Sequence, residues 1–309
     1  MTILVADVGG TNSRLALVDG AAPHSLMRYT NTGFASFYDI LRDYCSGRNL
    51  SGLTAVCVAI AGPVTSTRAQ LTNLNWQFDT QDIAAALPGC GPVRLVNDLV
   101  ALGHALAGLE AEHLSVIKPL GTAQLNNQAL VVGIGTGFNV CLVKDTEKGR
   151  APLVVEAELG HASLPQSVWA VLSHEIGDAA MQINANEDLF SGRGLSRLHK
   201  IISGGVNLPG AEIVGCYGGN TDATQAVDLM AQLLGILARE LVFQYLPLNG
   251  IYFAGSAAWG IFATDARLHF LKAFDRPGQF SDLIGQVPVK VITDDAAALL
   301  GAARYVSDS

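Results

Sequence analysis

Short apolar runs bounded by turn-forming residues recur along the chain and predict buried strands. Such runs combine β-branched or other apolar residues with glycine, proline, asparagine or aspartate at their ends. They occur at Ile3–Ala6, Leu15–Val18, Ala55–Ile60, Val93–Val96, Leu130–Val132, Val140–Val143, Ile251–Ala254 and Val287–Ile292. Stretches with helical spacing lie between them, so the pattern predicts an α/β or mixed fold.

The clearest helical pattern runs from about Ala223 to Tyr245, with Thr221 or Asp222 as the expected N-cap. Its few polar positions predict a helix that is mostly buried against a sheet.

The uncharged stretch Leu241–Thr264 is long enough to cross a bilayer. Proline, asparagine and glycine interrupt it, which favours a helix end, a turn and a buried strand over a membrane span.

Two segments of the chain repeat one pattern. Gly10–Val18 and Gly135–Val143 both read Gly-Thr, three spacer residues, and then apolar, any, apolar, Val. Each follows a predicted strand. The repeat predicts two related α/β halves, each with a strand, a glycine turn and a second strand, and a boundary near residue 107.

Composition narrows the class of protein. Half of the 309 residues are apolar, 15% are charged, and the net charge is −8. This balance is typical of an enzyme with buried sheets, and the negative surface disfavours nucleic-acid and acidic-membrane partners.

The N-terminal MTILVADVGG resembles a first strand more than a signal peptide. The single, scattered cysteines are Cys45, Cys57, Cys90, Cys141 and Cys216, and they favour free thiols in a reducing cytoplasm.

The first glycine turn, from Asp7 to Arg14, has the composition of a phosphate site. Glycine at positions 9 and 10 lets backbone N–H groups converge on an anion, and Thr11 adds a hydroxyl donor. Asp7 would repel phosphate directly but can hold Mg²⁺ through its water shell. A tight hairpin, in which the glycines only supply positive φ, is the alternative.

The second turn, Gly133–Gly137, is expected to form a second phosphate cradle. It does not fit the dinucleotide fingerprint G-x-G-x-x-G, because Phe138 occupies the position of the third glycine. The apolar alternation at Val140 and Leu142 also predicts that a strand follows this turn, where the fingerprint requires a helix.

Asn97 and Asp98 end one predicted strand and begin a helical pattern from Leu99 to Ala107. A carboxylate at the carboxyl end of a strand can accept the proton of a sugar hydroxyl, while the neighbouring amide orients the ring. Helix N-capping is the alternative interpretation of this pair.

Acidic residues and a histidine cluster at Glu156, Glu158 and His161, and Glu187 follows one amphipathic helix later. Carboxylates and a neutral imidazole can bind vicinal hydroxyls in a fixed geometry. A metal site is less favoured, because the Glu-x-x-His spacing has no second matching pair.

Together these residues resemble the bacterial-type ATP-dependent glucokinases of the sugar kinase, actin and heat-shock ATPase superfamily. The resemblance covers nearly the whole chain in order. It is carried by Asp7–Asn12, Leu71–Trp76, Val96–Asp98, Gly135–Gly137, Glu158–His161, Glu187 with Ser191–Leu195, and Phe253–Gly255.

The resemblance implies an α/β fold of two ribonuclease H-like (actin-like ATPase) domains flanking a central cleft. The smaller domain would comprise residues 1–107 and 293–309, and the larger one residues 108–292. The implied activity is ATP- and Mg²⁺-dependent phosphorylation of the 6-hydroxyl of D-glucose. A cytoplasmic homodimer is implied as well.

The resemblance also implies a role for each site residue. Asp98 would be the general base. The other sugar ligands would be Asn73, Asn97, Glu158, His161 and Glu187. The cofactor-binding residues would be Asp7, Gly9, Gly10, Thr11, Asn12, Gly135, Thr136, Gly137, Gly255 and Ser256, with Asp7 holding Mg²⁺ through water.

Three positions depart from the family pattern. Ser256 stands where a second glycine is usual, and Phe138 and Asn139 replace Leu-Gly after the second phosphate turn. These departures leave a non-catalytic sugar sensor as an alternative. A kinase for mannose, fructose or an amino sugar and a filament-forming ATPase are further alternatives. The absence of a cysteine-rich zinc motif and of N-terminal DNA-binding helices argues against the related repressor/kinase branch.

Overall fold

The chain divides into two units, each with its own sheet and its own core. The computed structural model describes residues 2–20, 22–48, 50, 52–71, 74–121, 126–146 and 150–307. The first unit comprises Met1–Leu109, Thr146–Val154 and Asp294–Ser309, and the second comprises Glu110–Asp145 and Val155–Thr293.

The first sheet has the strand order β3-β2-β1-β4-β7. β1 is antiparallel to β2 and parallel to β4, and β4 is parallel to β7. The strands are β1 (Thr2–Val8), β2 (Asn12–Asp19), β3 (Ala22–Thr30), β4 (Leu53–Ile60) and β7 (Val93–Asn97); β5 (Arg68–Gln70) and β6 (Gln77–Asp79) form a separate small pair.

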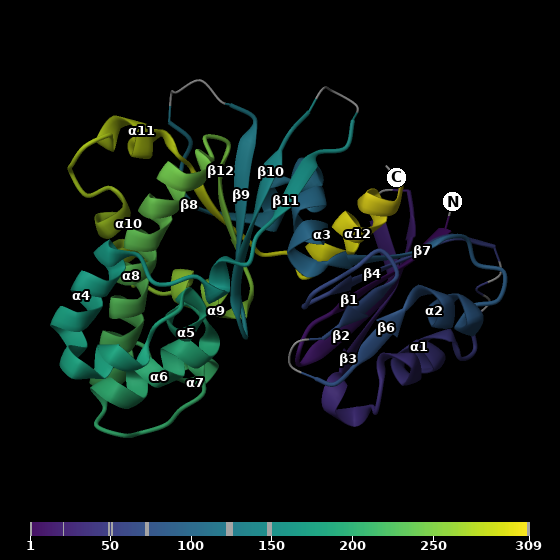
Figure 1. The fold of residues 1–309 in the computed structure, drawn as a ribbon, viewed down its shortest axis with the longest axis horizontal. Coiled ribbons are helices and arrows are strands. Elements are labelled where there is room, and N and C mark those ends of the chain that lie inside the picture. Colours follow the sequence, from purple (N-terminus) through teal and green to yellow (C-terminus); the bar gives the residue numbers. More distant parts are fainter. Residues whose placement is uncertain are drawn as a thin grey trace. The chain divides into compact units, whose positions relative to one another are not determined.

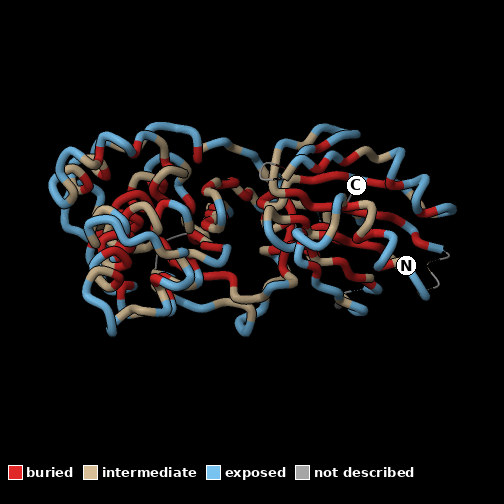
Figure 2. The backbone as a smooth tube through the Cα atoms, turned by 90° about the horizontal axis from the view of Figure 1, so that it is seen from below, coloured by how far each residue is buried: buried red, intermediate tan, exposed pale blue. Residues whose placement is uncertain are grey.

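Both faces of the first sheet are buried by helices (Figure 1). Side chains alternate along β1, so Leu4 packs in the core that contains α1, whereas Ile3 and Val5 pack in the core that contains α3 and α12. The buried central strands of the sheet are drawn red in Figure 2. The helices of this unit are α1 (Phe37–Cys45), α2 (Thr80–Ala86), α3 (Asp98–Ala105) and α12 (Ala297–Ser307).

The second sheet has the order β11-β10-β9-β12-β13-β8. After β8, the hairpin of β9 and β10 is followed along the chain by the parallel strands β12 and β13, as the hairpin of β1 and β2 is followed by β4 and β7. This matches the sequence repeat. Its strands are β8 (Leu114–Lys118), β9 (Gln128–Ile134), β10 (Phe138–Lys144), β11 (Leu153–Glu156), β12 (Gly250–Ala254) and β13 (Val289–Ile292). The helices of this unit are α4 (Gln166–Ile176), α5 (Asn186–Leu189), α6 (Gly192–Ile202), α7 (Gly210–Gly215), α8 (Thr221–Tyr245), α9 (Ser256–Phe262), α10 (Arg267–Phe274) and α11 (Ser281–Gln286).

The long helix α8 forms most of the second core, and the prediction of a mostly buried helix is confirmed. The predicted N-cap, Thr221 or Asp222, was wrong by one or two residues. The cap is Asn220, whose side chain accepts a hydrogen bond from the Ala223 N–H, so Thr221 and Asp222 already belong to the first turn.

The uncharged stretch that begins at Leu241 contains the end of α8, then β12 and α9. Among the described residues, no helix has the length and hydropathy needed to cross a membrane.

All of the strands predicted from apolar runs are present. The last begins at Val289, because Val287 instead caps the end of α11. Three of the strands that the pattern missed, β3, β8 and β11, lie at sheet edges, where one side of the strand is solvated and the apolar pattern is diluted. All five cysteines are free, as expected.

Candidate active site

The first glycine turn joins β1 to β2 and is closed by a hydrogen bond from the Gly9 N–H to the Asn12 carbonyl at 3.0 Å. Thr11 and Asn12 are exposed at its tip. Gly9 does not have positive φ, so positive φ does not account for this glycine. The exposed hydroxyl of Thr11 is available to donate to an anion.

A buried asparagine that the sequence did not single out braces this turn. Asn31 is 1% exposed. Its side-chain amide donates to the Gly9 carbonyl at 2.8 Å, its side-chain oxygen accepts from the Ser13 hydroxyl at 2.7 Å, and its backbone N–H donates to the Thr11 carbonyl at 2.9 Å. Two of these hydrogen bonds hold backbone carbonyls of the turn, and the third fixes the Asn31 side chain through Ser13.

We expect Asn31→Ala to raise the KM for ATP by about tenfold, since the buried partners of the lost amide would be left unsatisfied and the turn would loosen. Steady-state kinetics with ATP and glucose varied separately would measure this, and the KM for glucose should change much less. Asn220→Ala is the matched control, because it removes a helix cap of similar stabilising effect at α8. An unchanged KM for ATP in folded Asn31→Ala would contradict the bracing role.

Asp7 lies at the end of β1, directly before the turn. Burial raises the pKa of its carboxyl, and the Arg14 guanidinium, 2.9 Å away, opposes that rise. The described residues contain no group of three or more histidine, cysteine or acidic side chains that could hold a metal ion. One partly exposed carboxylate fits a Mg²⁺ ion that takes most of its oxygen ligands from water and phosphate.

Asn97 and Asp98 lie at the same edge of the first sheet as the glycine turn. In the register, Val8 at the end of β1 pairs with Ile60, and Ile60 pairs with Asn97. The carboxyl ends of these parallel strands therefore bring the expected base and the expected phosphate turn together within one unit.

The N-capping interpretation is correct for Asn97, whose side chain accepts from the Leu99 N–H at 3.0 Å and donates to the Gly62 carbonyl at 3.3 Å. Asp98 is the first residue of α3 and is half-buried. Its Oδ1 also accepts from the Leu99 N–H, at 2.9 Å, which orients the carboxylate. Asn73, the other sugar ligand expected in this unit, lies outside the described residues.

The second glycine turn joins β9 to β10, so a strand follows it as predicted. The Gly135 N–H donates to the Gly137 carbonyl at 3.0 Å, and the Gly135 carbonyl accepts from the Gly192 N–H at 2.8 Å. Thr136 is at the exposed tip of this turn. The first residue of α6 therefore anchors the turn.

The two departures at Phe138 and Asn139 connect this turn to the expected sugar ligands. The Phe138 N–H donates to Glu187 Oε2 at 3.2 Å. The Asn139 side chain donates to Glu158 Oε2 at 3.2 Å and accepts from the Leu159 N–H at 3.0 Å. Both residues lie in strand β10, which needs no glycine conformation. The turn thus contacts both expected sugar-binding carboxylates directly.

Glu158 precedes a short 3-10 turn and His161 is its last residue. Both are exposed, and the His161 N–H donates to the Glu158 carbonyl at 3.3 Å. Glu156 is exposed at the end of β11. Glu158 and His161 thus lie within one turn of each other, and Asn139 orients that turn from β10.

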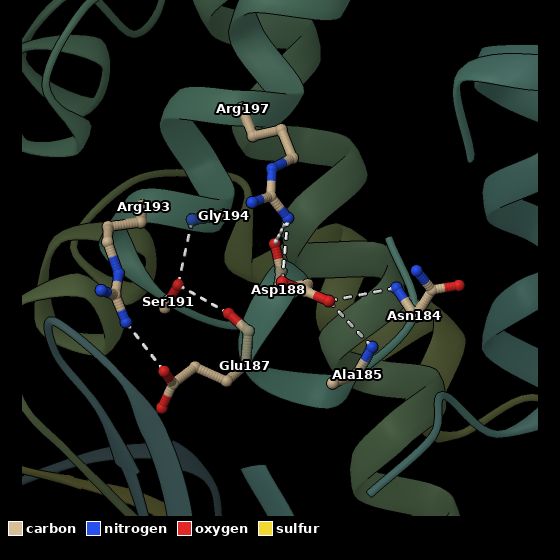
Figure 3. Close-up of polar contacts among 8 residues, drawn as sticks. All are labelled: Asn184, Ala185, Glu187, Asp188, Ser191, Arg193, Gly194 and Arg197. Atoms are coloured by element: carbon tan, nitrogen blue, oxygen red, sulfur yellow. Dashed lines mark hydrogen bonds and ion pairs between the residues drawn. The ribbon is translucent and has the colours of Figure 1, made fainter. Parts of the chain in front are cut away.

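Glu187 lies in α5, and Figure 3 shows its carboxylate beside Arg193 of α6. The Arg193 guanidinium is 2.7 Å from Glu187 Oε1. Ser191 donates to the Glu187 carbonyl at 2.8 Å and accepts from the Gly194 N–H at 3.0 Å, which caps α6. Arg193 belongs to Ser191–Leu195, one of the segments that carry the family resemblance, but no sequence signal assigned it to Glu187.

We expect Asn139→Gly, which restores the usual family residue, to raise the KM for glucose by about tenfold with a smaller change in kcat. The reason is that Glu158 and the Leu159 N–H would lose the side chain that orients them. Asn139→Asp should have a larger effect, since it keeps the acceptor but places a second negative charge beside Glu158. Steady-state kinetics would measure both variants, and a glucose KM unchanged in both would contradict this role.

Gly255 follows β12 and lies beside the second turn. Its φ is +97°, and an added Cβ would be 2.5 Å from the Ile134 carbonyl oxygen and 3.1 Å from the Gly135 N. Ala254 pairs with Gly133, so the ends of β9 and β12 meet here. Ser256 is the first residue of α9, where a helical conformation suits any residue, so its departure from glycine causes no backbone strain.

Comparison with known proteins identifies the family of this chain. The sequence model of the family described as Glucokinase matches residues 4–309. The chain belongs to the glucokinase family. A glucokinase of Saccharophagus degradans is 29% identical to it over 98% of this chain and 97% of that protein.

Solved structures of glucokinases share the fold. A glucokinase structure from an Antarctic psychrotroph has a TM-score of 0.77 and 27% identity, and the match covers 100% of this chain and 99% of that one. The glucokinase of Balamuthia mandrillaris, solved in complex with glucose, has a TM-score of 0.75 and 19% identity and covers 100% and 94%. The glucokinase family member described here therefore has the α/β fold of the actin-like ATPases.

Proposed function

We propose that the protein transfers the γ-phosphoryl group of ATP to the 6-hydroxyl of D-glucose, with Asp98 as the general base. Membership of the glucokinase family makes the chain an ATP-dependent hexose kinase. The observation that supports the base assignment is the register of the first sheet. It places Asp98 at the same edge as Asp7 and Gly9.

Asp98 is suited to accept the proton of the attacking hydroxyl. The Leu99 N–H fixes the direction of its carboxylate at the start of α3. Phosphoryl transfer requires little covalent chemistry from the protein, so a base that is already oriented contributes chiefly through alignment.

The glycine turns are the proposed phosphate ligands. In the first unit these are Gly9, Gly10, Thr11 and Asn12, and in the second unit Gly135, Thr136 and Gly137. Gly255 and Ser256 are the proposed adenosine contacts. Asp7 would hold Mg²⁺ through water, and bound Mg²⁺ neutralises charge that develops on the phosphate oxygens.

Glucose hydroxyls are the proposed ligands of Glu158, His161 and Glu187, together with Asn73 and Asn97. A carboxylate accepts hydrogen bonds from hydroxyls best when its position is fixed in advance. Asn139 orients Glu158, and the Phe138 N–H orients Glu187.

A coupled assay for glucose 6-phosphate, with and without ATP and Mg²⁺, tests this function. We expect product only when glucose, ATP and Mg²⁺ are all present. A panel with mannose, fructose and glucosamine in place of glucose would identify the preferred hexose. Glucose binding without any turnover would instead support a sugar sensor, and ATP hydrolysis with light scattering but without sugar would support a filament-forming ATPase.

The homodimer and the cytoplasmic location remain predictions. Size-exclusion chromatography with multi-angle light scattering would test the first, with one peak at twice the mass of 32.4 kDa expected. We likewise propose that the two units of the fold are the two domains that the family resemblance implies.

A further inference from the structure

A hollow of about 630 Å³ on the second unit is lined by three cationic side chains. Arg193, Arg197 and Lys200 follow one another at spacings of four and three residues, so they lie on one face of α6. The neutral polar side chains Gln182, Ser196 and Asn207 complete the polar lining, and none of the lining residues is acidic. The whole chain has 27 acidic and 19 basic residues, so this lining departs from the overall balance of charge.

Two of these cations are held by consecutive carboxylates, as Figure 3 shows. Arg193 pairs with Glu187 at 2.7 Å, and Arg197 pairs with Asp188 at 3.2 Å. The arginine side chains are 59% and 41% exposed. Exposed pairs of this kind stabilise a protein by only about 0–1 kcal/mol, so a more highly charged anion can attract the guanidinium groups away from them.

Both carboxylates have backbone partners that would remain after the arginines move. Asp188 Oδ2 accepts from the Asn184 N–H at 3.2 Å and the Ala185 N–H at 3.0 Å. Glu187 Oε2 accepts from the Phe138 N–H at 3.2 Å. The arginines can therefore change partner without a rearrangement of the loop that carries the carboxylates.

Lys200 adds a third positive charge to the hollow. Its side chain is exposed and has no ion pair within the part of the chain that the structure describes. Its ammonium group is thus available to an incoming anion at once, whereas the arginines must first exchange partners.

We propose that this hollow binds a phosphorylated small molecule, and that binding withdraws Arg193 from Glu187. A phosphoryl dianion accepts hydrogen bonds from guanidinium forks in bidentate geometry, and the ammonium of Lys200 adds a point charge. The volume is that of a site for a metabolite-sized ligand.

The consequence for the enzyme rests on the proposed role of Glu187 as a sugar ligand. When Arg193 leaves, Glu187 Oε1 loses its charged donor and becomes a stronger acceptor for a glucose hydroxyl. Occupancy of the hollow therefore lowers the KM for glucose, and the bound metabolite acts as an activator.

Calorimetry with inorganic phosphate tests the binding site. The protein would first be saturated with glucose, Mg²⁺ and a non-hydrolysable ATP analogue, so that phosphate cannot enter the catalytic site. We expect one phosphate to bind, and the double variant Arg197→Gln/Lys200→Gln to weaken its binding by at least about tenfold. Citrate should bind more weakly than phosphate, and tighter citrate binding would overturn the phosphoryl assignment.

Arg267→Gln/Lys272→Gln is the matched control, because it removes the same two charges from exposed positions on α10. It should bind phosphate as the unmodified protein does. Absence of phosphate binding, or equal weakening in both double variants, would overturn the site. If Arg197→Gln/Lys200→Gln fails to fold, the exposed single variant Lys200→Gln serves in its place.

Kinetics at saturating ATP test the link to Glu187. Phosphate should lower the glucose KM of the unmodified enzyme by about threefold, and it should leave that of Arg197→Gln/Lys200→Gln unchanged. Phosphate binding without any change in KM would overturn the link alone. Binding in the calorimeter by a protein with no kinase activity would refute the proposed function but leave the anion site intact.

Discussion

Replacement of Asp98 by asparagine is expected to lower kcat with glucose by about 100- to 10,000-fold. Asparagine has nearly the same shape and can still accept the Leu99 N–H bond that orients Asp98. It cannot accept the proton of the attacking hydroxyl. The coupled assay would measure kcat, and glucose binding followed by intrinsic fluorescence should change only a few-fold.

Asp82→Asn is the matched control for this variant. Asp82 is also an acidic residue in the first turn of a helix of the first unit, α2, and it is exposed. Its replacement removes the same favourable interaction with the helix dipole but should leave kcat unchanged. Substantial turnover by Asp98→Asn would exclude Asp98 as the base.

Replacement of Gly255 by alanine is expected to reduce the free energy of unfolding by at least about 2 kcal/mol and to weaken ATP binding. Two causes act together at this position. The backbone has φ of +97°, which side chains rarely tolerate, and the new Cβ would be forced against the Ile134 carbonyl. The strand end that carries the second glycine turn must then shift.

Urea unfolding and the KM for ATP would measure these two effects. Gly285→Ala is the control, since Gly285 lies in α11 with no atom within 4 Å of an added Cβ. That substitution should be neutral or slightly stabilising. A stable Gly255→Ala variant with normal ATP affinity would show that the backbone here relaxes easily.

The central strands of both sheets were predictable because burial on both faces imposes continuous apolar runs such as Ala55–Ile60. The edge strand β3 was not, because its sequence APHSLMRYT mixes polar residues with a proline and its side chains are largely exposed. The cap of α8 was misplaced for a local reason. Asn220, Thr221 and Asp222 are all competent caps, and sequence alone does not rank them.

The expected site residues were identified by motif, whereas their supporting contacts were not. Asn31 is 22 residues away from Gly9 in sequence, and only the pairing of β2 with β3 brings the two together. In the sequence, Asn139 was only a departure from the family's usual glycine, but its side chain forms hydrogen bonds to the turn at Glu158. The Arg193–Glu187 pair likewise depends on how α5 leads into α6. Contacts of this kind arise from tertiary structure and leave no periodic signal.

The first unit is assembled from both ends of the chain, and this has a consequence for biosynthesis. Leu299 and Ala302 of α12 are buried with Val5 and Ala101 in one core. During translation, residues 110–293 leave the ribosome before this helix does, so the second unit can fold while the first still lacks one of its layers. A nascent chain that stops short of residue 297 would therefore expose an apolar sheet face to chaperones and proteases.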